Sequence, residues 1–226
     1  MNVLVVASRK GGSGKSTLAA HLAAHIARPS RPIFLVDADP QGSLSLWHEL
    51  RGAENPVLRR GSRNMADALK AAARGGCEWA LVDTPPNVSA PVLEAMRLAT
   101  LVVIPARPGV FDLHAVHQTI ELARELKKPY CVVLNGAPPK RGDREAAIVT
   151  EARVGLDDER IPVWSGQISH RADFSLALGR GEGAKEFEPG SAAAAEIAAL
   201  WSAIDRSVKA INGASRTGRG MHKLAA

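Results

Sequence analysis

Short apolar runs alternate along this chain with segments of helical pattern, and this alternation restricts the possible folds more than any other feature. The runs are apolar throughout, as expected for strands that are covered on both faces of a sheet. Alternating strands and helices predict an α/β fold with a doubly wound, mostly parallel sheet and right-handed crossovers. Strands are predicted at 2–7, 32–37, 79–84, 100–105 and 130–135, and helices at roughly 15–28, 64–75, 89–98 and 112–128.

The C-terminal third continues the same pattern. We expect a helix near 143–153, a weak strand near 161–164 and a long alanine-rich helix over 191–211. No internal repeat and no linker divides the chain, so we expect a single domain over 1–211. Residues 212–226 are small, polar and basic, and we expect them to form a flexible tail. The packed side of the long helix is expected to hold Leu200, Ile204 and Ile211.

Composition excludes several classes of protein. A hydrophobic share of 46% in 226 residues supports a globular core. The apolar runs are too short to span a bilayer, and no secretory signal precedes the first strand, so we expect a cytoplasmic protein. Cys77 and Cys131 lack metal-ligand spacing, and we expect two reduced thiols. The net charge of +6 is compatible with binding to a polyanion and does not establish it.

The stretch SRKGGSGKSTL, residues 8–18, follows the first predicted strand and opens the first predicted helix. This context is typical of a phosphate-binding loop, in which a helix N-terminus adds its positive dipole end. Lys15 can reach the β- and γ-phosphates of ATP, the Ser16 hydroxyl is placed to ligate Mg²⁺, and Thr17 can bond the α-phosphate. Backbone N–H groups that turn toward the phosphates are expected from Gly11, Gly12, Ser13 and Gly14.

The loop departs from the strict Walker A pattern, because Arg9 stands where the first glycine is expected. The sequence KGGSGKST resembles the deviant Walker A loop of the ParA/MinD family of ATPases, whose signature is a second lysine before the glycines. The resemblance implies a P-loop NTPase fold. It also implies that Lys10 reaches across a dimer interface to the phosphates bound by the partner subunit. Two ATP molecules that face each other repel strongly, and a cation donated in trans offsets that repulsion.

Two carboxylate segments accompany the loop, LVDADPQG at 35–42 and LVDTPP at 81–86. Both lie at the carboxyl ends of predicted strands, where ligands of parallel sheets bind. They resemble the two switch regions of the family. The resemblance implies that Asp39 orients the attacking water, that Asp37 supports the switch, and that Asp83 holds Mg²⁺ through water. The implied metal site comprises Ser16, Asp39 and Asp83, and the implied catalytic residues are Lys10, Lys15 and Asp39.

Asn135 ends another predicted strand, in CVVLN. In the family an asparagine at this place reads the adenine base, although asparagine is also a common turn residue. Segment 168–197 is similar to the C-terminal pattern of the family, with an arginine, a small residue and a glycine, and then a proline before the last helix. The resemblance thus covers about residues 1–205.

The resemblance is strongest to the short ParA-type partitioning ATPases, because eight residues before the RKGG run leave no room for an N-terminal helix-turn-helix. It implies a homodimer that forms with ATP and binds duplex DNA of any sequence on the nucleoid. A ParB-like or other adaptor would stimulate slow hydrolysis, and the cargo would be a plasmid, a chromosome locus or a protein assembly. Basic residues in 51–74 are one candidate DNA surface, with ordinary solvated faces as the alternative. The other candidate DNA contacts are Arg206, Lys209, Arg216 and Arg219.

Other branches share the fold. An iron-protein reductase needs cluster-ligating cysteines after the second switch, whereas Cys77 precedes Asp83 and Cys131 lies in a predicted strand. A MinD-like membrane-associated ATPase needs a bulky amphipathic C-terminal helix, and the C-terminal segment offers only Met221 and Leu224. We therefore expect no membrane partner. A ligase of the dethiobiotin-synthetase type remains as a further alternative.

Overall fold

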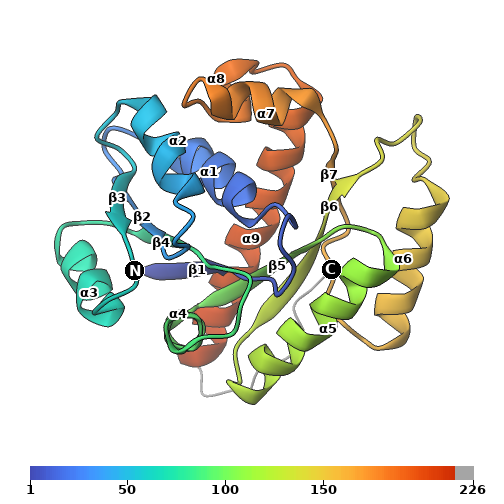
Figure 1. Cartoon of the computed structure of the whole chain (residues 1–226), viewed down its shortest axis with the longest axis horizontal. Helices are drawn as coiled ribbons and strands as arrows, with labels where there is room; N and C mark the ends of the chain where they lie inside the picture. Colours follow the sequence, from blue (N-terminus) through green and yellow to red (C-terminus); the bar gives the residue numbers. More distant parts are fainter. Residues whose placement is uncertain (217–226) are drawn as a thin grey trace.

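The computed structural model describes residues 1–216 and contains a seven-stranded sheet between two layers of helices (Figure 1). Every pair of neighbouring strands is parallel. The strands are β1 (Asn2–Val6), β2 (Ile33–Asp37), β3 (Val57–Arg60), β4 (Trp79–Asp83), β5 (Leu101–Ala106), β6 (Tyr130–Ala137) and β7 (Ile168–Ser169). Their order across the sheet is β3-β2-β4-β1-β5-β6-β7.

The helices divide between the two faces of the sheet, and each face has its own hydrophobic core. The helices that cover one face are α3 (Met65–Arg74), α4 (Ala90–Leu98), α5 (Val110–Glu125) and α6 (Ala147–Asp158). The other face is covered by α1 (Lys15–Ile26), α2 (Ser43–Arg51), α7 (Ala172–Gly179), α8 (Ala184–Phe187) and α9 (Ala192–Arg216).

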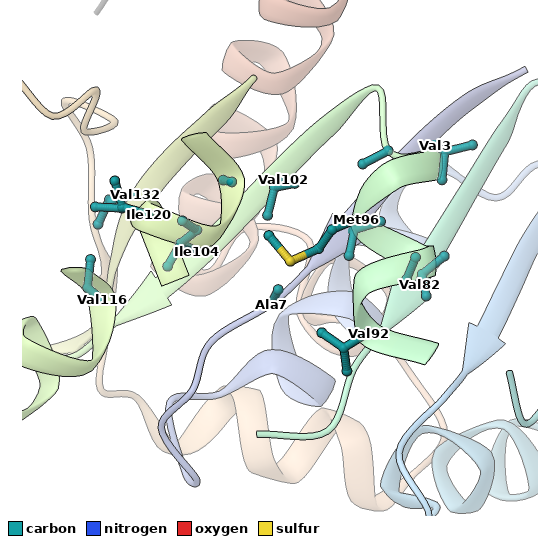
Figure 2. Close-up of a cluster of buried hydrophobic side chains, with 14 of the residues drawn as sticks. Val3, Ala7, Val82, Val92, Met96, Val102, Ile104, Val116, Ile120 and Val132 are labelled. Atoms are coloured by element: carbon teal, nitrogen blue, oxygen red, sulfur yellow. The ribbon is translucent and has the colours of Figure 1, made fainter. Parts of the chain in front are cut away.

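Both faces of the central strands are buried, which explains why their sequences are apolar throughout. Val3 and Val5 of β1 join the core under α4, whereas Leu4 and Val6 join the core under α1. Figure 2 shows the first of these cores, where Met96 of α4 lies over the strands. Successive side chains of a strand point to opposite faces, so a strand covered on both sides needs an unbroken apolar run.

The topology places a ligand site at the end of β1. The chain builds β2, β3 and β4 on one side of β1 and then β5, β6 and β7 on the other side. In open parallel sheets, ligands bind at the carboxyl ends of the strands where the order reverses in this way. The loop that follows β1 is the glycine-rich stretch, so this loop occupies the reversal point.

The predicted parallel α/β fold is confirmed, and all five predicted strands are present. The helix expected near 143–153 begins only at Ala147, because residues Arg141 and Arg144 exchange backbone hydrogen bonds in a tight turn before it. The weak strand expected near 161–164 is reduced to a single parallel bridge between Val163 and Val132, and the seventh strand lies at Ile168–Ser169 instead.

The C-terminal helix is longer than predicted. Leu200 and Ile204 are buried and Ile211 packs against the core beneath them, as expected. The helix ends at Arg216, so the predicted tail is helical over its first residues. Residues 217–226 lie outside the described part. Among residues 1–216, no helix has both the length and the apolar character needed to cross a bilayer.

Candidate nucleotide-binding site

The phosphate loop joins β1 to α1 and ends in a left-handed turn. Gly12 has φ 73° and Gly14 has φ 90°, conformations that are strained for residues with a side chain. Gly14 caps α1 without a side-chain hydrogen bond, and the first turn of the helix holds no acidic residue. The free N–H groups at this helix end therefore remain available to an anion.

The two lysines of the loop occupy different environments. Lys15 is buried, and its Nζ donates a hydrogen bond to the backbone carbonyl of Lys10 at 3.2 Å. Burial lowers the pKa of Lys15, and the carboxylates of Asp83 and Asp39 partly offset that effect. Lys10 is only half-buried, and its ammonium forms no ion pair within residues 1–216. One lysine therefore folds into the loop, while the other remains free at its rim.

Ser16 and Asp83 meet directly beneath the loop. The Ser16 hydroxyl donates to Oδ2 of Asp83 at 2.5 Å, and the second oxygen of this fully buried carboxyl has no hydrogen-bond partner in the described chain. Burial, together with the nearby carboxylates of Asp37 and Asp39, raises the pKa of Asp83 to about 7, although the Ser16 hydrogen bond and the charge of Lys15 act against this rise. A cation bound near Asp83 would therefore stabilise the ionised form of this carboxyl.

These residues fit a magnesium site. The hydroxyl of Ser16 and the unpartnered oxygen of Asp83 are hard oxygen donors on adjacent elements. Residues 1–216 contain no group of three or more His, Cys, Asp or Glu side chains that could hold a metal ion. Mg²⁺ does not need such a cage, because it keeps several waters and takes further ligands from bound phosphates.

The end of β2 supplies the other carboxylates. The register of β2 and β4 places Asp37 opposite Asp83. Asp37 is buried, and its oxygens accept hydrogen bonds from the backbone N–H of Asp39 at 3.2 Å and from the backbone N–H and hydroxyl of Ser45, both at 2.7 Å. Asp37 therefore ties the first turn of α2 to the sheet, and its predicted role in supporting the switch stays a prediction. Sequence reasoning missed Ser45, because no motif marks it.

Asp39 has a different environment from Asp37. It is half-buried, and one of its oxygens accepts the backbone N–H of Gln41 at 3.0 Å. Its second oxygen accepts no hydrogen bond in the described residues. This carboxylate is therefore available to a water molecule, as the predicted catalytic role requires. Its role in catalysis and at the metal stays a prediction.

The remaining predicted nucleotide contacts lie on or against the loop. Gly11 and Gly12 are exposed, and Thr17 is half-buried in the first turn of α1. Asn135 is buried at the end of β6, and its Nδ2 donates to the backbone carbonyl of Ser13 at 2.6 Å. The contact of Asn135 with an adenine base stays a prediction.

Threonine residues tie the loop to the DTPP segment and to α5, and sequence reasoning missed both of them. The Thr84 hydroxyl donates to the carbonyl of Val6, the last residue of β1, at 2.9 Å. The Thr119 hydroxyl accepts the backbone N–H of Arg9 at 3.2 Å. Thr84 lies inside the DTPP segment, so this motif could have identified it, whereas no sequence signal marks Thr119. The start of the phosphate loop is thereby fixed from two sides.

The predicted DNA contacts do not all carry free charge. Arg206 is exposed on α9, while Lys209 pairs with Asp205 at 2.7 Å. Arg216 ends α9, and Arg219 lies outside the described residues. In segment 51–74, three predicted cations have acidic partners, namely Arg51 with Glu186, Arg60 with Glu49 and Lys70 with Asp67.

Comparison with known proteins places this geometry in a family. Residues 4–184 match the family model CbiA, described as the CobQ/CobB/MinD/ParA nucleotide binding domain. The chain is 31% identical over 188 residues to maintenance of carboxysome distribution protein A of Halothiobacillus neapolitanus, which covers 79% of this chain and 84% of that protein. It is 32% identical over 127 residues to protein ParA of Rhizobium radiobacter, which covers 55% and 57% of the two chains.

Solved structures share the fold. An aspartate-to-alanine variant of Cyanothece McdA in complex with ATP superposes with a TM-score of 0.66 at 17% identity, covering 100% of this chain and 99% of that one. MinD of Pyrococcus horikoshii with Mg-ADP gives a TM-score of 0.71 at 17% identity, covering 93% and 98%. ATP or ADP with Mg²⁺ are the ligands expected for ATPases of the ParA and MinD type. From its loop, its sheet order and these matches, the chain belongs to the CobQ/CobB/MinD/ParA family of nucleotide-binding domains.

Proposed function

We propose that this protein is a ParA-type ATPase whose ATP-bound form is a DNA-binding homodimer that positions a cargo. The observation that carries the proposal is the convergence of Lys15, Ser16 and Asp83 under a loop whose rim holds a second lysine. This lysine, Lys10, has no ion pair in the described part of the chain. A monomeric phosphate loop needs only one lysine. The second lysine supports a switch that two subunits complete together.

The residues of the site divide the chemistry of ATP hydrolysis among them. Lys15, which now bonds the Lys10 carbonyl, would hold the β- and γ-phosphates, and the Ser16 hydroxyl, which now bonds Asp83, would be a ligand of Mg²⁺. When bound, Mg²⁺ neutralises charge on the phosphate oxygens. Asp83 would help to hold the hydrated Mg²⁺, and Asp39 would orient the attacking water. No strong general base accompanies Asp39, so hydrolysis by the protein alone is slow.

The position of Lys10 supports dimerisation through the phosphate-loop edge of the sheet. In the proposed dimer, Lys10 of each subunit contacts the phosphates held by the other subunit. Its positive charge offsets the repulsion between the two nucleotides, so the dimer forms only with ATP. Hydrolysis and phosphate release remove part of the negative charge that Lys10 binds, and the dimer separates.

The relatives guide the choice of cargo. Two carboxysome distribution proteins match over 84% and 88% of their own length, whereas the ParA of Rhizobium radiobacter matches over 57%. This favours a protein assembly as cargo over a plasmid or a chromosome locus. The proposal further includes a ParB-like or other adaptor that stimulates hydrolysis, and a cytoplasmic location on the nucleoid. Duplex DNA is bound through its phosphates without readout of bases.

The experiment is fluorescence anisotropy with two unrelated DNA duplexes, in ATP and in ADP, across a salt series. We expect equal affinity for the two sequences in ATP and much weaker binding in ADP. A dimer that makes about six phosphate contacts loses on the order of a thousandfold in affinity between about 50 and 200 mM salt. Binding that depends on sequence, or no binding in ATP at low salt, would contradict the DNA part of the proposal. The protein would then be an ATP-dependent switch that does not act on nucleoid DNA.

A further inference from the structure

The side chain of Asn135 is built into the back of the phosphate loop. It lies at the end of β6, where the register against β7 shifts: Asn135 and Ala137 oppose the consecutive residues Ile168 and Ser169. Gly136, between them, has φ 64°. A bulge of this kind re-aims a neighbouring side chain. The Asn135 side chain contacts the loop, and only 9% of the residue is exposed.

The contact is specific in its chemistry. The carbonyl of Ser13 can only accept a hydrogen bond, so the partner at 2.6 Å must be the amide nitrogen of Asn135. Ser13 is itself buried, and a buried carbonyl without a partner is costly. The fit is also close in space, because a Cβ added to Gly14 would lie 2.2 Å from the same nitrogen. The side chain of Asn135 therefore packs directly against the loop backbone and leaves no room for a side chain at position 14.

This hydrogen bond fixes the direction of one peptide unit. In a planar trans peptide, the C=O and the following N–H point in opposite directions. The Ser13 carbonyl is held on the side of Asn135, so the Gly14 N–H is turned to the opposite side of the loop. Gly14 is the residue that caps α1. Its N–H is thus one of the groups at the helix end that can donate a hydrogen bond to a phosphate oxygen.

We propose that Asn135 is a positioning residue of the phosphate loop, which holds the Ser13–Gly14 peptide so that its N–H faces the phosphates of any nucleotide. This inference rests on the proposed function, because it requires that the loop binds phosphates. It assigns to Asn135 an effect that is independent of the base. An asparagine that reads adenine would instead act on ATP and ADP and leave other phosphate compounds unaffected.

The test compares the affinities of Mg-ADP, Mg-GDP and inorganic tripolyphosphate for the unmodified chain and for the variants Asn135→Ala and Asn135→Asp. Both variants remove the amide donor, and the second keeps the size of the side chain. We expect Asn135→Ala to bind about tenfold more weakly, by the same factor for all three compounds, since the hydrogen bond that is removed belongs to the loop. Asn135→Asp should bind all three more weakly still, because its carboxylate also repels the phosphates. Asn212→Ala serves as the control, because this amide on α9 bonds only Asn2 in the described structure.

The outcomes separate the possibilities. A loss of affinity confined to ADP would make Asn135 a base-reading residue and overturn the inference, and so would unchanged affinity for all three compounds. If both variants fail to fold, as shown by circular dichroism, Asn135 is a residue of the fold and the inference is wrong. If the unmodified chain binds none of the three compounds, the proposed function itself has failed.

Discussion

At the scale of single residues, the site combines groups that the chain brings from distant positions. Asp37 and Asp83 are aligned by strand register, and Ser16 reaches Asp83 from the first turn of α1. Asp39 stands apart, because it is half-buried and, among residues 1–216, its side chain bonds only the backbone of its own turn. This separation lets a substitution at Asp39 affect the chemistry while it leaves the loop intact.

We predict that Asp39→Ala abolishes hydrolysis and preserves ATP binding. The carboxylate is expected to orient the attacking water, and removal of such a group lowers turnover by at least about a hundredfold. The ATP-bound dimer then accumulates. Phosphate release and light scattering in ATP measure the two effects, with the exposed Asp157→Ala on α6 as the control. Normal turnover in Asp39→Ala would remove this residue from the chemistry. Turnover of the unmodified protein above about 10 s⁻¹ without a partner would contradict the slow switch.

His21 makes the stability of the fold depend on pH. The imidazole is buried on α1, where Nδ1 accepts the backbone N–H of Ala184 at 3.0 Å and Nε2 donates to the carbonyl of Phe174 at 3.2 Å. Burial lowers its pKa from 6.5 to about 4, although the Phe174 carbonyl acts against this. The unfolded chain therefore binds the proton more readily than the folded chain between these two values. Stability is lost as the pH falls through this window.

We predict that the free energy of unfolding contributed by His21 falls by about 3 kcal/mol between pH 7 and pH 4. Urea unfolding at a series of pH values measures it. The variant His21→Gln should be less stable at pH 7 and should lose less stability on acidification. The exposed His114→Gln should keep the pH dependence of the unmodified chain. If His21→Gln and the unmodified chain show the same pH dependence, another group is responsible.

The motifs reveal some of these residues and not others. Lys10, Lys15, Ser16 and Asp83 follow from local sequence patterns, because the phosphate loop and the strand ends are continuous segments. Ser45, Thr84 and Thr119 act through hydrogen bonds to residues far away or on another element. Their partners are set by strand register and helix packing, which a single sequence does not encode in any motif. The contact of Asn135 with Ser13 joins residues 122 positions apart, so no local motif reveals this contact either.

At the scale of elements, long central strands are predictable and short peripheral elements are not. β4 and β5 are continuous apolar runs because helices cover both of their faces. β3 lies at the edge of the sheet, is four residues long and contains two arginines, so it lacks the apolar signal. β7 has only two residues. α2 follows the DPQG turn and buries only Leu44, Ser45 and Trp47, too few for a helical pattern to be recognised.

The turn between α7 and α8 braces α2, which follows the DPQG segment. The indole of Trp47 donates to the carbonyl of Glu182 at 3.2 Å, and Arg51 donates to the carbonyl of Gly181 at 3.0 Å. Gly181 has φ 70°, and an added Cβ would lie 2.2 Å from the backbone nitrogen of Arg51. No movement of a flexible side chain can relieve a contact between two backbones.

We predict that Gly181→Ala destabilises the fold by about 2–4 kcal/mol, through the strained φ and the contact with α2. Gly179 is the matched control, since a Cβ at that glycine meets nothing within 4 Å and its φ is not positive. Gly179→Ala should leave stability unchanged or raise it by up to about 1 kcal/mol. Denaturant unfolding of both variants measures the difference, and equal stabilities would show that α2 can shift without cost.

At the scale of the whole molecule, the parallel sheet gathers the predicted phosphate-binding groups at the carboxyl ends of its strands, and helices cover both of its faces. α9 belongs to the layer of α1, and its Arg206 is exposed. Arg97 on α4 is equally exposed in the opposite layer. The two arginines therefore allow a charge reversal on each side of the sheet.

We predict that Arg206→Glu weakens DNA binding in ATP and that Arg97→Glu has a much smaller effect. Removal of a single phosphate interaction from each subunit of a dimer should reduce the slope of log affinity against log salt by about 2. Fluorescence anisotropy with the same two duplexes gives the slopes. Equal effects of the two reversals would mean that only net charge matters and that α9 presents no DNA surface.

The proposed ATP-dependent dimer depends most on the second lysine of the loop, Lys10. Light scattering with Mg-ATP measures the mass of the particle directly, for the unmodified chain, for Lys10→Ala and for the control Lys70→Ala on α3. We predict twice the 23.9 kDa protomer mass for the unmodified chain and the control. Lys10→Ala should remain at the protomer mass while it still binds ATP, because the substitution removes only the interaction across the interface. A Lys10→Ala variant that dimerises with ATP as the unmodified chain does would contradict the account.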